Sequence, residues 1–254
     1  RNSKALVLLN WQECGKVLLS ALFLALHFAT WITSLEFTSI ASSVVMVPTT
    51  PLWVALLSPL VLKEKIRNAV LVGLVISVVG GVIVGLANIC SLEAGGVVCQ
   101  AQGFTGKAMW GNALALVGAW MAAGYMLMGR QLRKKLDTIS YTALVYGTAA
   151  GILLGVVILK AEPVFSYSSQ TYLWLLALGV IPQLLGHSIL NWALKYISAA
   201  YVSLTLLGEP IGTSILAYFF LRESPTLMEG VGAVLILVGI AIGSVRRMKV
   251  SANE

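Results

Sequence analysis

Residues 199–221 read AAYVSLTLLGEPIGTSILAYFFL, an apolar stretch that carries one charged residue, Glu209, between Gly208 and Pro210. A helix of about 20 apolar residues crosses a hydrocarbon core of about 30 Å. A charged group near the centre of such a helix costs roughly 2.5 to 3.5 kcal/mol, so it usually faces a cavity, a partner or a protonation step. The stretch therefore predicts a membrane-spanning helix with a functional carboxylate.

The composition of the whole chain agrees with this stretch. Of its 254 residues, 58% are hydrophobic and 11% are charged, whereas a soluble domain carries about 25% charged residues. The apolar runs have helix-spanning length and lack the strand alternation of a membrane barrel. We predict an all-α integral membrane protein with eight visible transmembrane helices near residues 17–35, 38–62, 66–87, 108–129, 138–160, 170–194, 197–221 and 225–245.

The net charge of +7 is explained by orientation rather than by a nucleic-acid partner. Basic residues lie in short loops between the predicted helices, and such loops are enriched in Lys and Arg on the cytoplasmic side. With a cytoplasmic N-terminus, all Lys and Arg residues except Lys107, Lys160 and Arg222 fall on the inner side. We expect a multi-pass protein of the cell (inner) membrane with both visible termini in the cytoplasm.

An internal repeat appears when the chain is shifted by 159 residues against itself. Two three-helix stretches then align without a gap, and the matched pairs include Pro51 with Pro210, Glu64 with Glu223, Gly73 with Gly232 and Gly80 with Gly239. Each copy has three spans and two further spans lie between the copies, so corresponding helices are five spans apart. Because five is an odd number, the second copy enters the membrane from the opposite side. Inverted repeats of this kind are common among secondary transporters.

These residues resemble the drug/metabolite transporter superfamily, EamA type. The resemblance rests on 39–64, which contains Pro51 and ends at Glu64, and on 198–223, which contains Gly208, Glu209 and Pro210. It implies two inverted five-helix repeats. The first, incomplete repeat would occupy residues 1–90, an outer loop 91–107 and the second repeat 108–254. The resemblance also implies two earlier helices before Arg1.

Polar side chains recur on single faces of the predicted helices. Gln183, His187 and Asn191 are spaced by four residues, and so are Tyr201, Thr205, Glu209 and Thr213 in the next helix. Other candidates for the same polar region are His27, Trp31, Thr49, Thr50, Trp53, Asn112, Trp120 and Tyr125. One interpretation is a central cavity with aromatic walls and a few orienting polar groups. The other is that these residues only join neighbouring helices by hydrogen bonds.

Glu209 and the two histidines leave similar alternatives open. Burial would raise the pKa of a carboxyl, so Glu209 could exchange protons during transport or bind a cationic group. It could equally satisfy backbone groups freed by Pro210. His27 and His187 could relay protons or act as hydrogen-bonded structural groups. No His, Cys or carboxylate lies at metal-ligand spacing with either histidine, so we expect no metal and no cofactor.

Hinges and a disulfide complete the list of candidate features. Pro51, Pro182, Gly208 and Pro210 would bend their helices and free carbonyl groups toward a cavity. Cys90 and Cys99 share the predicted outer loop and form either a disulfide or two free thiols.

The sequence favours a secondary transporter that exports a small organic solute, such as an amino acid or a drug-like compound, by alternating access. Protons are a possible coupling ion, and the oligomeric state is open. No Lys or Arg lies deep in a predicted helix, so neutral, zwitterionic or cationic solutes fit better than phosphorylated ones. An organellar antiporter of phosphorylated metabolites or nucleotide sugars is the alternative within the fold. An intramembrane enzyme using His27, His187 and Glu209 is the alternative of another class, without a recognisable nucleophile motif.

Overall fold

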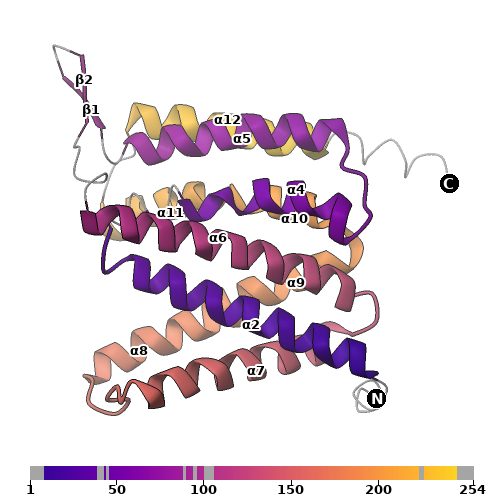
Figure 1. The fold of residues 1–254 in the computed structure, drawn as a ribbon. Coiled ribbons are helices and arrows are strands. Elements are labelled where there is room, and N and C mark those ends of the chain that lie inside the picture. Colours follow the sequence, from indigo (N-terminus) through magenta and orange to yellow (C-terminus); the bar gives the residue numbers. More distant parts are fainter. Residues whose placement is uncertain are drawn as a thin grey trace.

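The computed structural model describes residues 9–38, 43, 46–87, 90–93, 96–99, 106–222 and 226–244, and describes only the backbone at 85, 87, 90–93, 96–99, 210, 213, 214, 217 and 221. These residues form a helical bundle with one short hairpin (Figure 1). The helices are α2 (Trp11–Ser34), α4 (Thr50–Val61), α5 (Asn68–Ala87), α6 (Gly106–Leu132), α7 (Thr138–Leu159), α8 (Ser169–Leu178), α9 (His187–Tyr196), α10 (Ala199–Leu206), α11 (Glu209–Leu216) and α12 (Leu227–Ser244).

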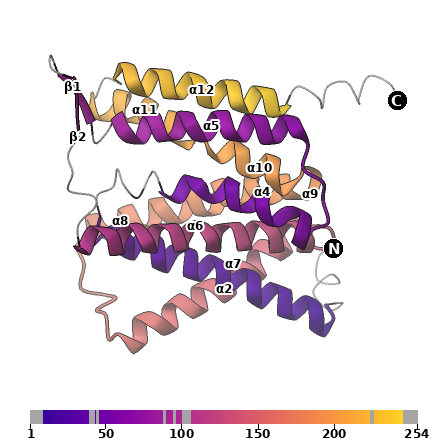
Figure 2. The same ribbon diagram turned by 45° about the horizontal axis from the view of Figure 1, so that its top comes forward.

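The helices lie side by side in layers. Figures 1 and 2 show α5 and α12 paired at one edge of the bundle, with α7 toward the opposite edge. Between them, α2 packs along α6, and α4 packs against α6 and α10. The strands β1 (Cys90–Glu93) and β2 (Gly96–Cys99) form an antiparallel hairpin after α5, with Cys90 opposite Cys99.

Side-chain caps fix where several helices begin. The Asn10 side chain accepts a hydrogen bond from the Glu13 N–H at 2.9 Å, and the Glu13 carboxylate accepts one from the Asn10 N–H at 3.0 Å. This reciprocal pair is a capping box, which satisfies two of the four unpaired N–H groups at a helix start. At α7, α8 and α10 the cap is simpler, because one side chain accepts a hydrogen bond from the third backbone N–H of the helix; these caps are Asp137, Ser168 and Ser198.

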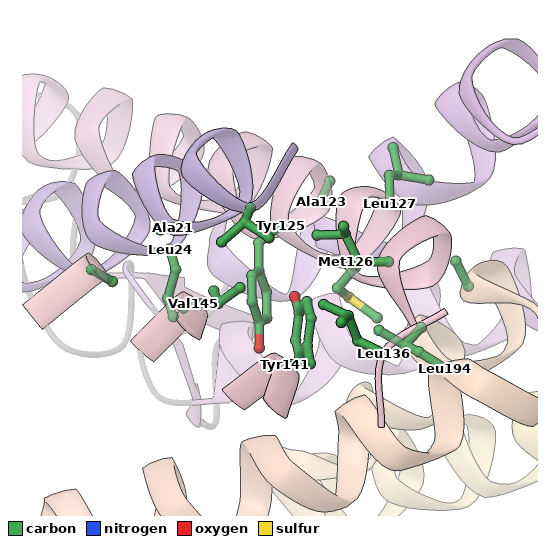
Figure 3. Packing of buried hydrophobic residues seen from close by; sticks show 14 of the residues in the cluster. Ala21, Leu24, Ala123, Tyr125, Met126, Leu127, Leu136, Tyr141, Val145 and Leu194 are labelled. Carbon is green, nitrogen blue, oxygen red and sulfur yellow. The ribbon is translucent and has the colours of Figure 1, made fainter. Parts of the chain in front are cut away.

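The largest apolar cluster lies where α2, α6, α7 and α9 meet, and Figure 3 shows part of it. Small residues allow α2 and α6 to approach closely, because Ala21 and Ala123 are fully buried. A Cβ atom added to Gly124 would lie 2.8 Å from the ring of Phe23. The α2 and α6 backbones therefore depend on small side chains for their spacing.

The second tight region, which we call the α5–α12 contact, is made by backbone atoms. A Cβ atom added to Gly80 would lie 2.6 Å from the Gly232 carbonyl oxygen, and one added to Gly73 would overlap the Gly239 carbonyl. Midway between these pairs, the Ser77 hydroxyl donates to the Ile236 carbonyl at 3.2 Å. Only glycine permits such a separation between two helix backbones.

Two of the predicted spans contain breaks in regular α-helix. Between α8 and α9, Gly179–Gly186 is π-helical and contains Pro182. Proline has no N–H and its ring clashes with the carbonyl four residues earlier, so the helix widens there. The predicted span 197–221 is divided into α10, α11 and a π-helical end, Ala217–Leu221. A 3₁₀ turn, Val47–Thr49, likewise precedes α4.

The structure supports an all-helical membrane protein. Five helical stretches among the described residues have the length and apolar composition to cross a membrane: Trp11–Ser34, Gly106–Leu132, Thr138–Leu159, Ser169–Tyr196 and Leu227–Ser244. Val47–Val61 and Asn68–Val84 are shorter apolar helices. Large apolar side chains such as Leu173, Trp174 and Ile181 are exposed along the Ser169–Tyr196 stretch. Such a surface is stable against lipid rather than water.

Candidate functional site

Polar side chains from four helices meet beside the α2–α6–α7 core in a group that we call the polar seam. Its members are Ser20 and His27 from α2, Tyr125 from α6, Tyr141 and Tyr146 from α7, Gln183 from the π-helical segment, and His187 and Asn191 from α9. The sequence predicted five of these eight residues. It missed Ser20, Tyr141 and Tyr146. The two tyrosines could have been found, because a tyrosine hydroxyl in an apolar span needs a hydrogen-bond partner.

Asn191 is the hub of the polar seam. Its side chain is fully buried, and its amide nitrogen donates to the Tyr125 hydroxyl at 2.5 Å and to the Tyr146 hydroxyl at 3.0 Å. A second link joins the Ser20 and Tyr141 hydroxyls at 3.0 Å. The Tyr125 and Tyr141 rings lie next to each other in Figure 3. Two hydrogen-bonded links, with the Tyr125 and Tyr141 rings packed between them, thus extend from α2 to α9.

The two histidines belong to a row of rings. The ring of His27 stacks on Trp31 with centroids 5.6 Å apart and lies 5.1 Å from Phe28. Phe28 in turn lies 5.8 Å from His187, and Tyr125 lies 6.0 Å from His187 on another side. The His27 Nδ1 atom is 2.9 Å from the Gly118 carbonyl oxygen, which can only accept, so Nδ1 carries the proton. The polar seam therefore has aromatic walls.

Three buried polar atoms of the seam have no hydrogen-bond partner within the described part of the chain: Gln183 Oε1, His187 Nδ1 and Asn191 Oδ1. They belong to one continuous helical stretch, at the spacing of four residues seen in the sequence. Burying such a group without a partner costs about 1 to 3 kcal/mol. Native proteins keep few of these groups, so this row has the character of a binding surface for a solute or water.

Thr50, Trp53 and Trp120 form a separate group between α4 and α6. The rings of Trp53 and Trp120 pack edge to face with centroids 5.1 Å apart. Thr50 is buried, and its hydroxyl lies 2.8 Å from the Val47 carbonyl oxygen and 3.3 Å from the Ala119 carbonyl oxygen. Trp53 Nε1 donates to the Thr49 hydroxyl at 3.3 Å. These polar groups have partners, so they join α4 to α6.

The stripe predicted on 201–213 is divided by the break before α11. The Tyr201 hydroxyl lies 2.5 Å from the Ser244 hydroxyl of α12, and the Thr205 hydroxyl donates to its own helix at the Val202 carbonyl. Glu209 is the first residue of α11 and is exposed. The side chains of Pro210 and Thr213 lie outside the described atoms, as do those of Cys90 and Cys99. Two members of the stripe therefore have structural hydrogen bonds.

A group of arginine contacts lies where α4, α6 and α9 end. Arg130 Nε donates to Glu64 Oε1 at 2.9 Å, and Arg133 Nε donates to the Asn191 carbonyl at 2.9 Å. Glu64 is thus paired with Arg130, which lies on a different helix. In the following loop, donation from the Ser140 N–H and hydroxyl holds the pKa of Asp137 below its usual value.

Known proteins resemble the chain in sequence and fold. The model of the EamA-like transporter family matches residues 2–86 and 109–245. An uncharacterized transporter from Archaeoglobus fulgidus is 21% identical over 240 residues, which cover 94% of this chain and 78% of that protein. A chloroplastic WAT1-related protein from Arabidopsis thaliana is 27% identical over 214 residues, 81% of this chain and 48% of that protein.

A crystal structure with 20% sequence identity superposes with a TM-score of 0.74 and covers 95% of this chain and 79% of that one. At this identity the likeness concerns the fold. It shows that the helical arrangement described above occurs in a solved protein.

Proposed function

Because this chain belongs to the EamA-like transporter family, we propose that it is a secondary transporter that exports small organic metabolites, such as amino acids or drug-like solutes, by alternating access. The observation that carries this proposal is the row of unpartnered buried atoms at Gln183, His187 and Asn191. A solute that passed along this row would supply the missing hydrogen bonds. The family match also sets the chain among transporters rather than enzymes.

The charges around the polar seam support the class of solute. Residues 17–34, 108–129, 138–159 and 169–194 contain no Lys, Arg, Asp or Glu. A phosphorylated solute would lack the fixed cation that normally binds it there. Aromatic faces and acceptor atoms instead suit a neutral, zwitterionic or cationic solute. Small molecules of this kind are the proposed substrates.

The α5–α12 contact supports two inverted halves. A shift of 159 residues matches Gly73 with Gly232 and Gly80 with Gly239. Gly73 faces Gly239 and Gly80 faces Gly232, so the exchange of the two halves turns one contact into the other. The hydrogen bond between Ser77 and Ile236 joins a matched pair, so it would lie on the pseudo-two-fold axis of the proposed exchange. Rocking of two such halves about a midplane site is a common transport mechanism.

The helix starts support the same pairing. α4 begins at Thr50, one residue before Pro51, and α11 begins at Glu209, one residue before Pro210. Proline is well placed in the first turn of a helix, where its missing N–H has no helical partner. The two halves therefore share a half-helix start, and only the second half has an acid there. We propose that Glu209 couples transport to protons, in a protein of the cell (inner) membrane whose visible termini are cytoplasmic.

Flux into proteoliposomes tests the function. Protein-containing and empty liposomes would be compared across a panel of labelled amino acids and organic cations, with imposed pH gradients. We expect saturable, protein-dependent flux of at least one solute and a loss of about tenfold in Gln183→Met or His187→Phe, because each removes both polar atoms of a side chain, including the one without a partner among the described residues. Gln170→Met is the matched control, since Gln170 is exposed on the same helical stretch. Flux equal to that of empty liposomes for every solute would refute the transporter.

Glu209→Gln tests the coupling separately. The variant should retain exchange of labelled for unlabelled solute, because exchange needs no net proton movement. It should lose accumulation driven by a pH gradient. An unchanged response to the gradient would remove Glu209 from the coupling mechanism while leaving the transporter intact.

A further inference from the structure

One guanidinium joins three helix ends. Arg130 lies in the last turn of α6, and its Nε donates to Glu64 Oε1 at 2.9 Å, just beyond α4. Its Nη1 donates to the carbonyl oxygens of Leu194 at 2.6 Å and Lys195 at 3.0 Å, in the last turn of α9. We call Arg130, Glu64 and these two carbonyls the Arg130 latch. A single side chain thus binds both the carboxylate that follows α4 and the carbonyl groups at the end of α9.

The chemistry of the helix ends explains why an arginine occupies this position. The last four carbonyls of a helix have no partner in their own helix, and the negative end of the helix dipole attracts a cation. The planar guanidinium can donate to a carboxylate and to carbonyls at the same time, whereas an ammonium is a point charge. Arg130 therefore caps α9 and binds Glu64 with one rigid group.

Arg133 provides a contrast one turn further on. Its side chain is 1% exposed and donates to the carbonyls of Asn191 and Leu136 and to the Thr138 hydroxyl. These partners belong to α9 and to the loop and helix that follow Arg133 itself. Removing one partner of a buried charge is strongly destabilising. Arg133 is thus a permanent anchor between α6 and α9.

The Arg130 latch is easier to break. The side chains of Arg130 and Glu64 are 15% and 22% exposed, and pairs near the surface contribute little to stability. The second oxygen of Glu64, Oε2, is buried without a hydrogen-bond partner among the described residues. Glu64 is therefore only half satisfied in this state. Such an ion pair stabilises one conformation but can be broken during a conformational change.

We propose that Arg130 and Glu64 form the gate at this end of the bundle, closed in the present conformation. Release of Arg130 frees the end of α4 from the end of α9 and opens the polar seam to the solvent on this side. α9 also carries His187 and Asn191, so the helix that binds the solute is the helix that the latch holds. A gate has a role only if the protein transports a solute, so the inference rests on the proposed function. Its geometry rests on the contacts of the Arg130 latch.

Thiol labelling tests the gate without a substrate. The reporter is Leu190→Cys, at a partly buried position on α9 packed against the core, in a background with Cys14, Cys90 and Cys99 replaced by Ser. A hydrophilic maleimide reacts with it in purified protein when the seam opens. Arg130→Gln should raise the labelling rate about tenfold, because two charge-assisted contacts to α9 and one to Glu64 are lost. Glu64→Gln should raise it severalfold.

Three comparisons make the result decisive. The double variant should react no faster than Arg130→Gln, because Glu64 acts through Arg130. Lys134→Gln is the matched control, since the Lys134 side chain is 54% exposed and its ammonium lies 4.0 Å from Glu64, and the labelling rate of this variant should stay within about twofold. A second reporter, Ser77→Cys, lies fully buried in the α5–α12 contact.

Faster labelling at residue 190 alone supports the gate. Unchanged labelling rates in Arg130→Gln would overturn the gate. Equal increases at residues 190 and 77 would also overturn it, because they would show that the whole protein has loosened. Failed flux in proteoliposomes would refute the transport function and would leave the labelling result unaffected.

Discussion

The α5–α12 contact and the polar seam are built in opposite ways. In the α5–α12 contact, glycines bring two backbones together, and no side chain can be inserted between Gly80 and Gly232. In the polar seam, side chains from four helices meet through hydroxyl, amide and imidazole groups, some of which have atoms without a partner among the described residues. Two backbones in direct contact can pack in only one arrangement. The hydrogen bonds between side chains of the seam can instead be replaced by hydrogen bonds to a solute.

This difference suits the α5–α12 contact to a fixed axis of motion and the polar seam to a solute pathway. Packed interfaces change between discrete arrangements rather than deforming continuously. The α5–α12 contact lies on the pseudo-two-fold axis that we infer between the halves, so it can stay in place while they move. The polar seam lies between helices that the Arg130 latch also joins, so motion there would expose the unpartnered atoms. The first predictions below alter one of the two regions, and the later ones alter a loop or a hairpin beside them.

The largest effect is expected from a methyl group in the α5–α12 contact. Gly80→Ala should destabilise the protein by about 1 to 3 kcal/mol or more, because the new Cβ would lie 2.6 Å from the Gly232 carbonyl and 2.9 Å from the Ile236 nitrogen. Gly81→Ala is the matched control, since its Cβ would meet nothing within 4 Å. We expect it to be neutral or slightly stabilising. Thermal unfolding in detergent measures both.

Equal unfolding midpoints for Gly80→Ala and Gly81→Ala would show that α5 and α12 can separate at little cost. The α5–α12 contact would then be no more rigid than the polar seam. The comparison between the two regions would fail at its first step.

The next effect concerns the hub of the polar seam. Asn191→Leu should destabilise by about 1 to 3 kcal/mol, because it leaves the hydroxyls of Tyr125 and Tyr146 without the amide donor. Tyr146→Phe alone should cost about 1 kcal/mol. In a double-mutant cycle the two changes should be coupled, since they remove the same hydrogen bond. Strict additivity of their unfolding free energies would contradict the shared network.

A smaller, pH-dependent effect is expected at the loop beside the seam. Ser140 donates to the Asp137 carboxylate from its N–H at 2.9 Å and from its hydroxyl at 2.8 Å, so the pKa of Asp137 lies below its ordinary value in the folded protein. This cap therefore contributes stability above the ordinary pKa of an aspartate, about 3.9, and loses it as the pH falls through the lower folded pKa. Asp137→Ala should cost about 1 kcal/mol at pH 7.

Thermal midpoints measured at pH 7 and pH 3 check this cap. The difference between wild type and Asp137→Ala should shrink at the lower pH. Asp137→Asn should retain most of the cap at both values, because its amide oxygen accepts the same bonds without titrating. A difference that stays constant with pH would exclude the carboxylate as the source.

How far the sequence could predict these regions depended on the separation of the residues involved. Periodicity within one helix placed Gln183, His187 and Asn191 on one face, because a spacing of four residues defines a helix face, and their role at a site stays a prediction. The Gly208–Pro210 sequence predicted a bend, and a helix ends and restarts there. Local rules were sufficient in both cases.

Contacts between distant residues could not be predicted in the same way. The repeat matched Gly73 with Gly232, but Gly73 touches Gly239, because contact depends on how the two halves dock. Arg130 and Glu64 are 66 positions apart, and nothing local distinguishes Arg130 from Lys134 as a partner. The Tyr201 to Ser244 bond likewise required the position of α12. Docking, rather than helix periodicity, decides these pairs.

The smallest effect on either region is expected from the β1–β2 hairpin. The register places Cys90 opposite Cys99 in the antiparallel pair, where directly opposed residues are close enough for a disulfide. We predict a bridge, detected as protection of both thiols from alkylation in denatured protein until a reductant is added. Reduction should leave the thermal unfolding of the helices nearly unchanged, because the bridge closes a local hairpin that lies outside both helix contacts and can open independently of them. A large loss on reduction would mean that the hairpin supports the end of α5, and the α5–α12 contact would no longer be self-sufficient.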